Sequence, residues 1–369
     1  MSEAQAHDVY YDLAKRLDDP DAIKAVPEIL RYLVTEEEAG ILLGLPEGRL
    51  ATAEEVREAV GAELEAVEKA LWRAYEIGIL ACGSTEGGER TYGYADIYVD
   101  SICGDPRNNV HGEEYRRLWA QWTEEQIKRR DAARQQSLMG GGRVLPYEEV
   151  FHDHNTSTVI PYDDAREIVE NSRVRAVGQC PCKYRSGGCK YPMDDICMFL
   201  DHMAEMCLER GSHREISKEE ALAVLKRTAE AGLVHMSGQS RFADSSNGAE
   251  FICSCCGCCC AFFEHYLKYP EEGKILSNYY CEVDPELCTG CGECVDRCFV
   301  EATYVADGVC VIDQDKCLGC GVCAYVCERK AKSVRKKKGA PVPHPTAHRH
   351  FIEPRVAPGG KPAPKPKEN

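Results

Sequence analysis

No stretch of the chain approaches the ~20 consecutive apolar residues that a membrane-spanning helix needs, and the first eight residues lack the basic and apolar regions of a signal peptide. Also missing are a phosphate-binding loop, a dinucleotide fingerprint, a Ser–His or Cys–His pair and a paired-carboxylate pattern. We therefore expect a cytoplasmic protein without a membrane span, and we can name no residue as catalytic.

Cysteine is nearly absent from the first half of the chain and abundant in the second. Of the 23 Cys among 369 residues, 21 lie between Cys180 and Cys327. A chain of this length with 44 % hydrophobic residues can form ordinary cores, so it does not need disulfides to fold. In a reducing cytosol, cysteines clustered at spacings of two and three residues are typical of metal binding.

Basic residues are scarce in the body of the chain. The net charge is −16, but residues 329–369 contain 12 Lys and Arg against 2 Asp and Glu, which leaves −26 on residues 1–328. An acidic body repels phosphate backbones, which argues against general nucleic-acid binding. It suits docking to basic surfaces around redox centres.

The first hundred residues predict helices that end in a hairpin. Thr52 and Glu55 form a capping-box pattern at the start of one helix, and Gly78 ends a second helix before a hairpin over residues 79–94. The second helix carries its apolar residues at three- and four-residue spacing, at Leu64, Val67, Leu71 and Tyr75. Helix, turn, helix and two-stranded wing is the order of a winged-helix domain.

This domain lacks the charge of a DNA reader. The second helix begins with Glu63, Glu65 and Glu68, where a DNA-binding domain places Arg, Lys, Asn or Gln. We therefore interpret it as a protein-docking or dimerising module, and we do not expect DNA as a partner.

The strongest signal is a pair of identical cysteine spacings near the end of the chain. Both runs have the pattern C-x2-C-x2-C-x3-C, and the second begins 29 residues after the first. Three thiolates on one tight loop can reach three corners of a four-iron cubane, and glycines between them give the backbone room. The candidate cofactor-binding residues are Cys288, Cys291, Cys294, Cys298, Cys317, Cys320, Cys323 and Cys327.

Residues 279–335 resemble the bacterial two-cluster [4Fe–4S] ferredoxin, a pseudo-twofold repeat of a hairpin and a helix. The resemblance implies two clusters. It assigns the first three cysteines of the first run to one cluster together with Cys327, and the first three of the second run to the other together with Cys298.

The chain departs from this family at one position of each run. The Pro that usually follows the fourth cysteine is Phe299 in the first run and Glu328 in the second. This leaves ligation intact but alters the local turn and the solvation of a cluster. A zinc ribbon is the alternative, which four cysteines within eleven residues, repeated, disfavour.

A second cysteine group lies in the middle of the chain. It has the pattern C-x-C-x6-C-x7-C and consists of Cys180, Cys182, Cys189 and Cys197. Apolar residues on one side predict a helix over residues 194–209, with Cys197 in its first turn, where the helix dipole favours thiolate. Cys207, nearly three turns further on, is expected to be a buried apolar thiol.

A third group places six thiols within eight residues, namely Cys253, Cys255, Cys256, Cys258, Cys259 and Cys260. Adjacent cysteine side chains diverge, so we expect the six to serve more than one centre, and the sequence does not assign individual thiols. With the second group they would complete one or two further iron–sulfur clusters; a structural zinc site or a single unusual cluster are the alternatives. A helix capped by Ser217 and ended by Gly232 would bring the two groups together.

Five cysteines stand outside the three groups. We expect them to be ordinary small buried residues. They are Cys82, Cys103, Cys207, Cys281 and Cys310.

As a whole the chain resembles multi-cluster iron–sulfur proteins of anaerobes, in which a winged-helix-like N-terminus precedes Cys-rich segments and a two-cluster ferredoxin module. The resemblance implies electron transfer within a larger oxidoreductase complex. We therefore expect a subunit without catalysis of its own that relays single electrons through several [4Fe–4S] clusters to protein redox partners. The alternatives are a redox-sensing winged-helix regulator and a reductase with a catalytic cluster in residues 180–260.

The end of the chain is rich in Lys and Pro and cannot bury enough apolar surface to fold alone. A solvated tail, a docking strap and a nucleic-acid contact are the three interpretations. Phe351, Ile352 and Val356 interrupt the charges and favour an arm that docks on a protein partner.

These observations predict an α+β protein with several domains. The predicted parts are a winged-helix-like domain (1–100), a helical linker region (101–179), a Cys-rich metal-binding domain (180–278), a two-cluster ferredoxin domain (279–335) and an extended basic tail (336–369).

Overall fold

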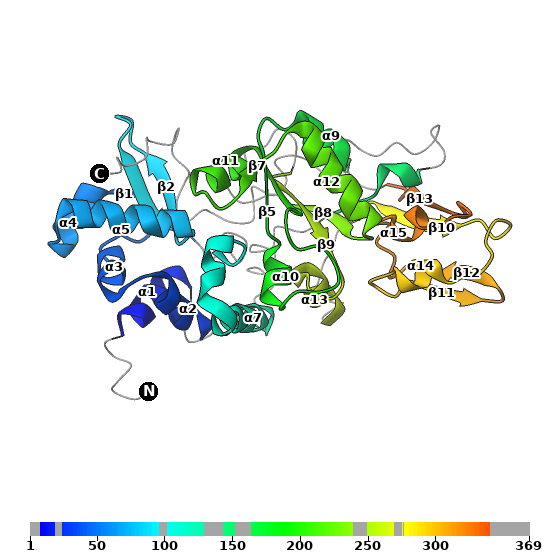
Figure 1. Ribbon diagram of the computed structural model, residues 1–369, viewed down its shortest axis with the longest axis horizontal. Helices are drawn as coiled ribbons and strands as arrows, with labels where there is room; N and C mark the ends of the chain where they lie inside the picture. Colours follow the sequence, from blue (N-terminus) through cyan, green and yellow to red (C-terminus); the bar gives the residue numbers. More distant parts are fainter. Residues whose placement is uncertain are drawn as a thin grey trace.

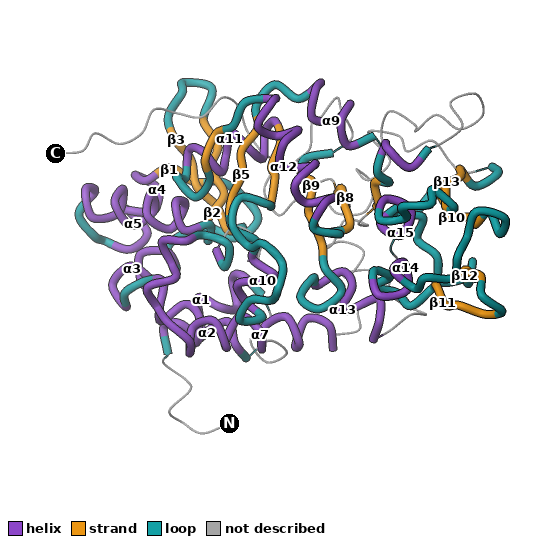
Figure 2. Tube along the Cα trace, turned by 45° about the vertical axis from the view of Figure 1, so that its right-hand side comes forward, coloured by secondary structure: helices purple, strands orange, loops and turns teal. Residues whose placement is uncertain are grey.

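The computed structural model describes residues 8–18, 24–95, 102–128, 143–151, 164–238, 249–268, 275 and 277–339. These residues form three bodies in a row: an N-terminal helical module, a central sheet and a C-terminal cysteine module (Figure 1). The view turned by 45° shows the same order (Figure 2). The mixture of helices and sheets confirms the predicted α+β class.

Local sequence chemistry sets the helix ends of the N-terminal module. Thr35 and Thr52 each form a capping box with the glutamate three residues on, and Gly78 ends the longest helix of this module at φ 103°. The predicted capping box, helix stop and hairpin are confirmed. The elements are α1 (Val9–Leu17), α2 (Ala25–Leu33), α3 (Glu36–Leu42), β1 (Ala51–Thr52), α4 (Ala53–Val60), α5 (Leu64–Ile77), β2 (Leu80–Ser84) and β3 (Arg90–Tyr94).

The helices and the small sheet of this module enclose one core. β3 lies between β1 and β2, and all its pairings are antiparallel. The apolar stripe of α5 enters the core through Val67, Leu71 and Tyr75, whereas Leu64 is 38 % exposed. The first turn of α5 therefore faces solvent together with the exposed Glu65.

A helical segment joins this module to the central sheet. It consists of the 3-10 turn η2 (Pro106–His111) and α7 (Gly112–Lys128). α7 packs against α2 and against α10 (Pro181–Arg185), and it buries Tyr115 and Trp119 completely. The start of the second cysteine group is thus fixed to the N-terminal module.

The central body is a six-stranded antiparallel sheet in the order β4-β8-β9-β6-β5-β7. Its buried face packs against α9 and α12. As predicted, Ser217 caps α12 and the following Gly232 has a left-handed conformation. The remaining elements are β4 (Arg143–Leu145), η3 (Glu148–Val150), α9 (Ala165–Asn171), β5 (Arg175–Gly178), β6 (Cys197–Leu200), α11 (Asp201–Glu209), β7 (Arg214–Glu215), α12 (Lys218–Glu230), β8 (Val234–Gly238), β9 (Phe251–Cys255) and α13 (Ala261–Lys268).

The predicted helix over residues 194–209 is wrong in its first half. Cys197 lies in strand β6, which pairs with β5 on one side and β9 on the other, and the helix begins only at Asp201. The run from Ile196 to Leu200 is wholly buried, as expected of a strand with neighbours on both sides. A short apolar run of this kind has no period that separates a buried strand from a helix.

The C-terminal module repeats one unit of strand, cysteine loop, short helix and strand. β10 pairs with β13 and β11 pairs with β12, so each of the two small sheets contains one strand from each half of the repeat. Its core is continuous with that of β4, η3 and β8 of the central body. Its elements are β10 (Tyr279–Val283), α14 (Glu293–Asp296), β11 (Thr303–Ala306), β12 (Val309–Ile312), α15 (Val322–Tyr325) and β13 (Lys332–Lys336).

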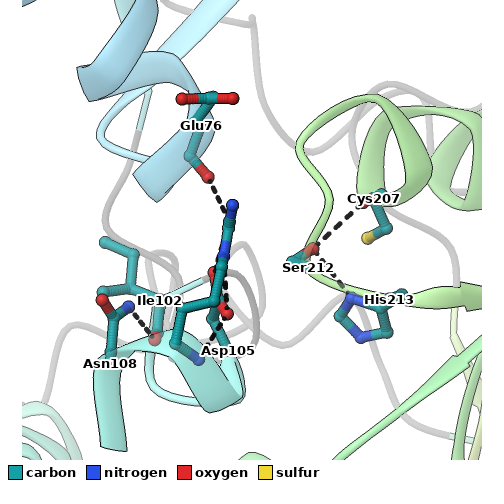
Figure 3. Close-up of polar contacts among 8 residues, drawn as sticks. Glu76, Ile102, Asp105, Asn108, Cys207, Ser212 and His213 are labelled. Atoms are coloured by element: carbon teal, nitrogen blue, oxygen red, sulfur yellow. Dashed lines mark hydrogen bonds and ion pairs between the residues drawn. The ribbon is translucent and has the colours of Figure 1, made fainter. Parts of the chain in front are cut away.

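Polar contacts fix the N-terminal module to the central body. Glu209 at the end of α11 accepts hydrogen bonds from the Tyr75 hydroxyl and from the Arg90 guanidinium, the latter at 3.0 Å. Nearby, the Arg107 guanidinium binds the Asp105 carboxylate and the backbone carbonyl of Glu76. Figure 3 shows Glu76 and Asp105 opposite the turn that carries Ser212. The second half of α5 is therefore engaged within the molecule.

Candidate metal centres

The two cysteine loops of the C-terminal module are shaped by glycine. Gly290 and Gly319 occupy the same place in the two loops, with φ of 64° and 59°. A Cβ at Gly290 would overlap the carbonyl of Gly308, and one at Gly319 would overlap the backbone of Tyr279. Because any side chain would clash there, only glycine lets the first loop approach the β11–β12 turn, and the second loop approach β10, this closely.

The second run lines a cavity together with the last cysteine of the first run. Cys298, Cys317, Cys320 and Cys323 all face it, beside apolar side chains from the central body and from the module itself. Burial raises the pKa of Cys320 above its ordinary value. The pKa of Cys323 falls to about 7, because the Cys281 thiol hydrogen-bonds to it and Lys332 adds a positive charge.

Cys281 and Cys310 have a closer relation to these runs than we expected. The backbone N–H of Cys281 donates to Cys317 Sγ at 3.4 Å, and that of Cys310 donates to Cys288 Sγ at 3.3 Å. Their own thiols contact the third cysteine of a run, Cys323 at 3.7 Å and Cys294 at 3.5 Å respectively. Both are buried, as predicted, but each also supports a cysteine loop.

Sequence reasoning missed this second role although a signal was present. Cys281 stands seven residues before Cys288, and Cys310 stands seven residues before Cys317. The 29-residue repeat therefore includes a fifth cysteine in each half.

A buried lysine lies between the two halves of the module. Lys332 on β13 is 2 % exposed, and its ammonium hydrogen-bonds to the thiols of Cys310 and Cys294. Burial alone would lower the pKa of Lys332, but the charges of thiols from both runs, Cys323 and Cys294, raise it above its ordinary value. Such a cation is costly to bury without negative charge nearby, and the cysteine runs are where that charge would be.

In the central body four thiols converge. Their sulfur atoms all lie within 4.8 Å of one another, and we call them the quartet: Cys189, Cys256, Cys258 and Cys259. Burial would raise the pKa of Cys189, but the Tyr191 backbone N–H and the neighbouring thiols lower it. Burial raises the pKa of Cys256 to about 11.

The other six candidate thiols of the central body form a chain of contacts. This six-thiol group consists of Cys180, Cys182, Cys197, Cys253, Cys255 and Cys260. The pKa of Cys182 falls well below its ordinary value because the thiols of Cys180 and Cys260 hydrogen-bond to it. The pairing of β6 with β9 brings the second and third sequence groups together, and α10 and α13 begin beside them.

Basic side chains are buried behind both thiol groups. Lys183 is 1 % exposed and donates to the carbonyl oxygen of Ser254 at 3.1 Å. Burial alone would lower the pKa of Lys183, but the thiols of Cys180 and Cys256 raise it above its ordinary value. Arg185 donates to the carbonyl of Cys259 and to the carboxylate of Glu264. The site therefore carries fixed positive charge where thiolates would be negative.

Phe299, which replaces the usual Pro, lies between the C-terminal module and the quartet. Its ring makes edge contacts with Tyr191 and Phe263, and it also lines the cavity of the second run. A Cβ at Gly257 would stand 2.9 Å from the Cβ of Phe299, so the turn between Cys256 and Cys258 is pressed against this residue. Phe299, which stands where the family usually has Pro, thus fills the space between the quartet and the cavity of the C-terminal module.

The three remaining cysteines are outside the two thiol groups of the central body, although Cys103 and Cys207 pack beside the six-thiol group. Cys103 is buried in the N-terminal core, where its Sγ lies 3.7 Å from the carbonyl oxygen of Pro181. Cys82 is half-buried beside Arg90, and Cys207 is buried under α11 with Phe199 and Ala204. Cys103 and Cys207 are buried as expected, whereas Cys82 is only partly buried and accepts a hydrogen bond from Arg90.

The residues present fit iron–sulfur clusters in the C-terminal module. The donor set is entirely thiol, backbone N–H groups point at three of the sulfurs, including that of Cys298, and the glycines let the two loops pack directly against the β11–β12 turn and β10. Soft thiolates with hydrogen bonds to sulfur are the ligands such clusters use.

Comparisons with known proteins agree with this chemistry over a short segment. Residues 281–303, which contain the whole first run, match the family model of the 4Fe-4S binding domain. No curated protein and no solved structure matches the chain. In the described ranges, no helix has both the length and the apolar character to cross a membrane. Together the match and the all-thiol loops of the C-terminal module support an iron–sulfur electron-transfer role.

Proposed function

We propose that this protein relays single electrons through several [4Fe–4S] clusters to a partner oxidoreductase, as a non-catalytic subunit of a larger complex. The observation that carries the proposal is the 4Fe-4S family match on the first cysteine run, joined to the cavity that Cys298 of that run shares with the second. Each such cluster, when bound, accepts and releases one electron.

In this proposal each cluster takes three thiolates from one loop and a fourth from the other run. Cys298 and Cys327 are the exchanged ligands, and the shared cavity supports the exchange at Cys298. The chain's own contribution is to hold the thiolates, to donate backbone N–H groups to sulfur, and to exclude water with its apolar walls. These features set how readily an electron is accepted.

We extend the proposal to a third cluster in the six-thiol group. The buried cation of Lys183 supports it, because no carboxylate in the described ranges forms an ion pair with that ammonium and the neighbouring thiols are its source of negative charge. The contacts do not name which four of the six would be ligands. The quartet has a different spacing and is not part of this proposal.

The N-terminal module is proposed to be a winged-helix-like docking domain. The element order and the three-stranded sheet support this. Two observations disfavour DNA as its partner: the exposed start of α5 carries carboxylates, and the second half of α5 is engaged with α11 through Tyr75 and Glu209. A protein partner is the better match for this surface.

The test is metal and sulfide analysis of the full chain purified without oxygen, followed by reduction and low-temperature electron paramagnetic resonance. Three clusters predict about twelve iron and about twelve acid-labile sulfide per chain, and signals that appear on reduction. We expect Cys320→Ser to lower iron by up to about four per chain, whereas the half-buried Cys82→Ser leaves it unchanged.

A chain that holds no iron under these conditions, or whose iron gives no reducible signal, would refute the proposed function. Loss of equal iron in Cys320→Ser and Cys82→Ser would also count against it, because the loss would then report general instability.

A further inference from the structure

Thiol pairs in contact occur in the C-terminal module and in the six-thiol group, but in the described ranges it is the quartet that brings four thiols together. In the quartet the Sγ of Cys189 and Cys256 are 4.0 Å apart, those of Cys256 and Cys258 are 3.5 Å apart, and those of Cys258 and Cys259 are 3.5 Å apart. Among the His, Cys, Asp and Glu side chains of the described ranges, no other three ligand atoms lie this close together. The cysteines of the second C-terminal run line a cavity instead.

These two arrangements suit different metal centres. Four thiolates around one tetrahedral ion at about 2.3 Å stand about 3.8 Å from one another. The Sγ distances of 3.5 to 4.0 Å between Cys189 and Cys256, Cys256 and Cys258, and Cys258 and Cys259 are close to this value, and all four sulfurs lie within 4.8 Å of one another. A four-iron cluster places its irons and sulfides between the ligands, so its thiolates must stand further apart. The open arrangement of the second C-terminal run suits a cluster, and the compact quartet suits a single ion.

The backbone around the quartet is built to bring its two segments together. Cys189 follows Gly187 and Gly188, which turn the chain at φ of 85° and 87°. The other three thiols lie on the tight turn before α13, which Phe299 packs against at Gly257. The Tyr191 N–H bonds to the Cys189 sulfur, so the loop carries its own support for a thiolate.

The charge around the quartet matches an anionic complex. A divalent ion in four thiolates carries a net charge of −2. Lys183 is buried close enough to Cys256 for their charges to interact. The guanidinium of Arg185 binds the backbone carbonyl of Cys259, but its charge is paired with the Glu264 carboxylate, so Lys183 is the cation that faces the quartet. Cys258 is exposed while Cys256 and Cys259 are buried, which gives an ion a path to the site from solvent.

We propose that Cys189, Cys256, Cys258 and Cys259 bind a single tetrahedral metal ion, which we expect to be zinc, as a structural site. A closed set of four thiolates leaves no open position for substrate, so the ion's role is to tie residues 187–191 to the turn before α13. That turn borders Phe299 and, through it, the cavity of the C-terminal module. The site holds the arrangement of cysteine centres without carrying electrons.

The first test is X-ray absorption at the zinc and iron edges of the wild-type full chain. We expect one zinc per chain with four sulfur neighbours at about 2.3 Å. Cobalt(II), exchanged into the site, should show the absorption of a tetrahedral tetrathiolate. Neither readout depends on a variant that folds or on electron-transfer activity.

The second test compares Cys258→Ser with Cys82→Ser. Cys258 is the exposed member of the quartet, so its replacement perturbs packing least. We expect Cys258→Ser to lose zinc while iron and sulfide stay at the wild-type level, and Cys82→Ser to lose neither. One iron without sulfide in the site would retain the single-ion proposal and overturn the choice of zinc.

Loss of about four iron and four sulfide from Cys258→Ser, in a chain that never held zinc, would overturn the proposal in favour of a cluster. The test of the quartet can fail independently of the test of the proposed function. A chain with zinc but no iron would refute electron transfer and leave the zinc site as proposed. A chain with about sixteen iron and no zinc would support electron transfer and refute the zinc site.

Discussion

At the scale of single residues, Lys332 has the largest expected effect on redox chemistry. Its ammonium is buried between thiols of both cysteine runs and hydrogen-bonds to those of Cys310 and Cys294. A fixed positive charge stabilises the reduced, more negative state of a nearby cluster more than the oxidised state. Lys332 should therefore raise the reduction potentials of the C-terminal module.

We predict that Lys332→Met lowers both potentials of that module by on the order of 50 mV, since a unit charge at close range in a protein interior is worth about 1 to 2 kcal/mol. Methionine keeps the length and apolar stem of lysine, so packing is largely conserved. The measurement is a redox titration followed by electron paramagnetic resonance.

Lys336→Met is the matched control, because Lys336 lies on the same strand and is partly exposed. Its charge is screened by solvent and should shift the potentials little. Potentials in Lys332→Met that stay constant or rise, with iron content preserved, would contradict this assignment.

The sequence repeat of the cysteine loops contains more information than the two runs of four cysteines, because Cys281 and Cys310 also recur at the 29-residue interval. The C-x2-C spacing indicates thiolate loops because it is a local constraint, and Gly290 and Gly319 follow from the same constraint. The role of Phe299 could not be predicted. Its ring contacts Tyr191 and Phe263, which are far from it in sequence, so only the tertiary fold places it between two sites.

At the scale of elements, the corner from β6 to α11 shows where sequence reasoning fails. Thr35 and Thr52 set helix starts by bonds to residues three positions away, and such ends can be predicted. The run from Ile196 to Leu200 is apolar at every position, so its state is decided by pairing with β5 and β9. That pairing depends on residues about 20 and 50 positions away, which local patterns do not contain.

The corner itself depends on Asp201. This residue has a left-handed backbone at φ 49°, and its Oδ1 accepts a hydrogen bond from the Arg173 N–H at 2.6 Å. We predict that Asp201→Ala lowers the free energy of unfolding by about 2 kcal/mol, because alanine loses the hydrogen bond and tolerates a positive φ poorly. Thermal unfolding under anaerobic conditions measures the change.

Asp201→Asn is the matched variant, since asparagine tolerates the left-handed region and keeps an oxygen acceptor. Its loss should be clearly smaller than that of Asp201→Ala, and both variants should keep their iron. Equal losses in the two variants would show that charge, rather than backbone conformation and the hydrogen bond, holds the corner.

At the scale of the whole molecule, the basic charge is concentrated at the end of the C-terminal module. Residues 329–338 contain seven Lys and Arg, whereas residues 340–369, which lie outside the described residues, contain five against two acidic residues. β13 extends to Lys336, and the Lys337 N–H bonds to the carbonyl of Asn278 at 2.7 Å. A truncation that tests the proposed docking tail should therefore begin at residue 340, beyond the sheet.

We therefore expect the exposed Lys337 and Lys338 to contribute more to the proposed docking than residues 340–369. We predict that the double variant Lys337→Glu with Lys338→Glu weakens binding to an acidic redox partner about tenfold at low salt, because two charges at the edge of the proposed interface change sign. Deleting residues 340–369 should weaken binding less, and neither change should alter iron or sulfide. The measurement is the dissociation constant for the partner that co-purifies with the chain, taken across a salt series.

The salt series distinguishes two causes of weaker binding, the loss of electrostatic attraction and a change in the shape of the surface. At about 1 M salt the screening length falls to about 3 Å, so the double variant and the wild type should bind alike if the lysines act by charge. Binding that is equally weak at all salt concentrations would mean that the substitutions disturb the surface itself. Undiminished binding at low salt would move the docking site to the acidic body, whose charge of −26 over residues 1–328 suits a basic partner instead.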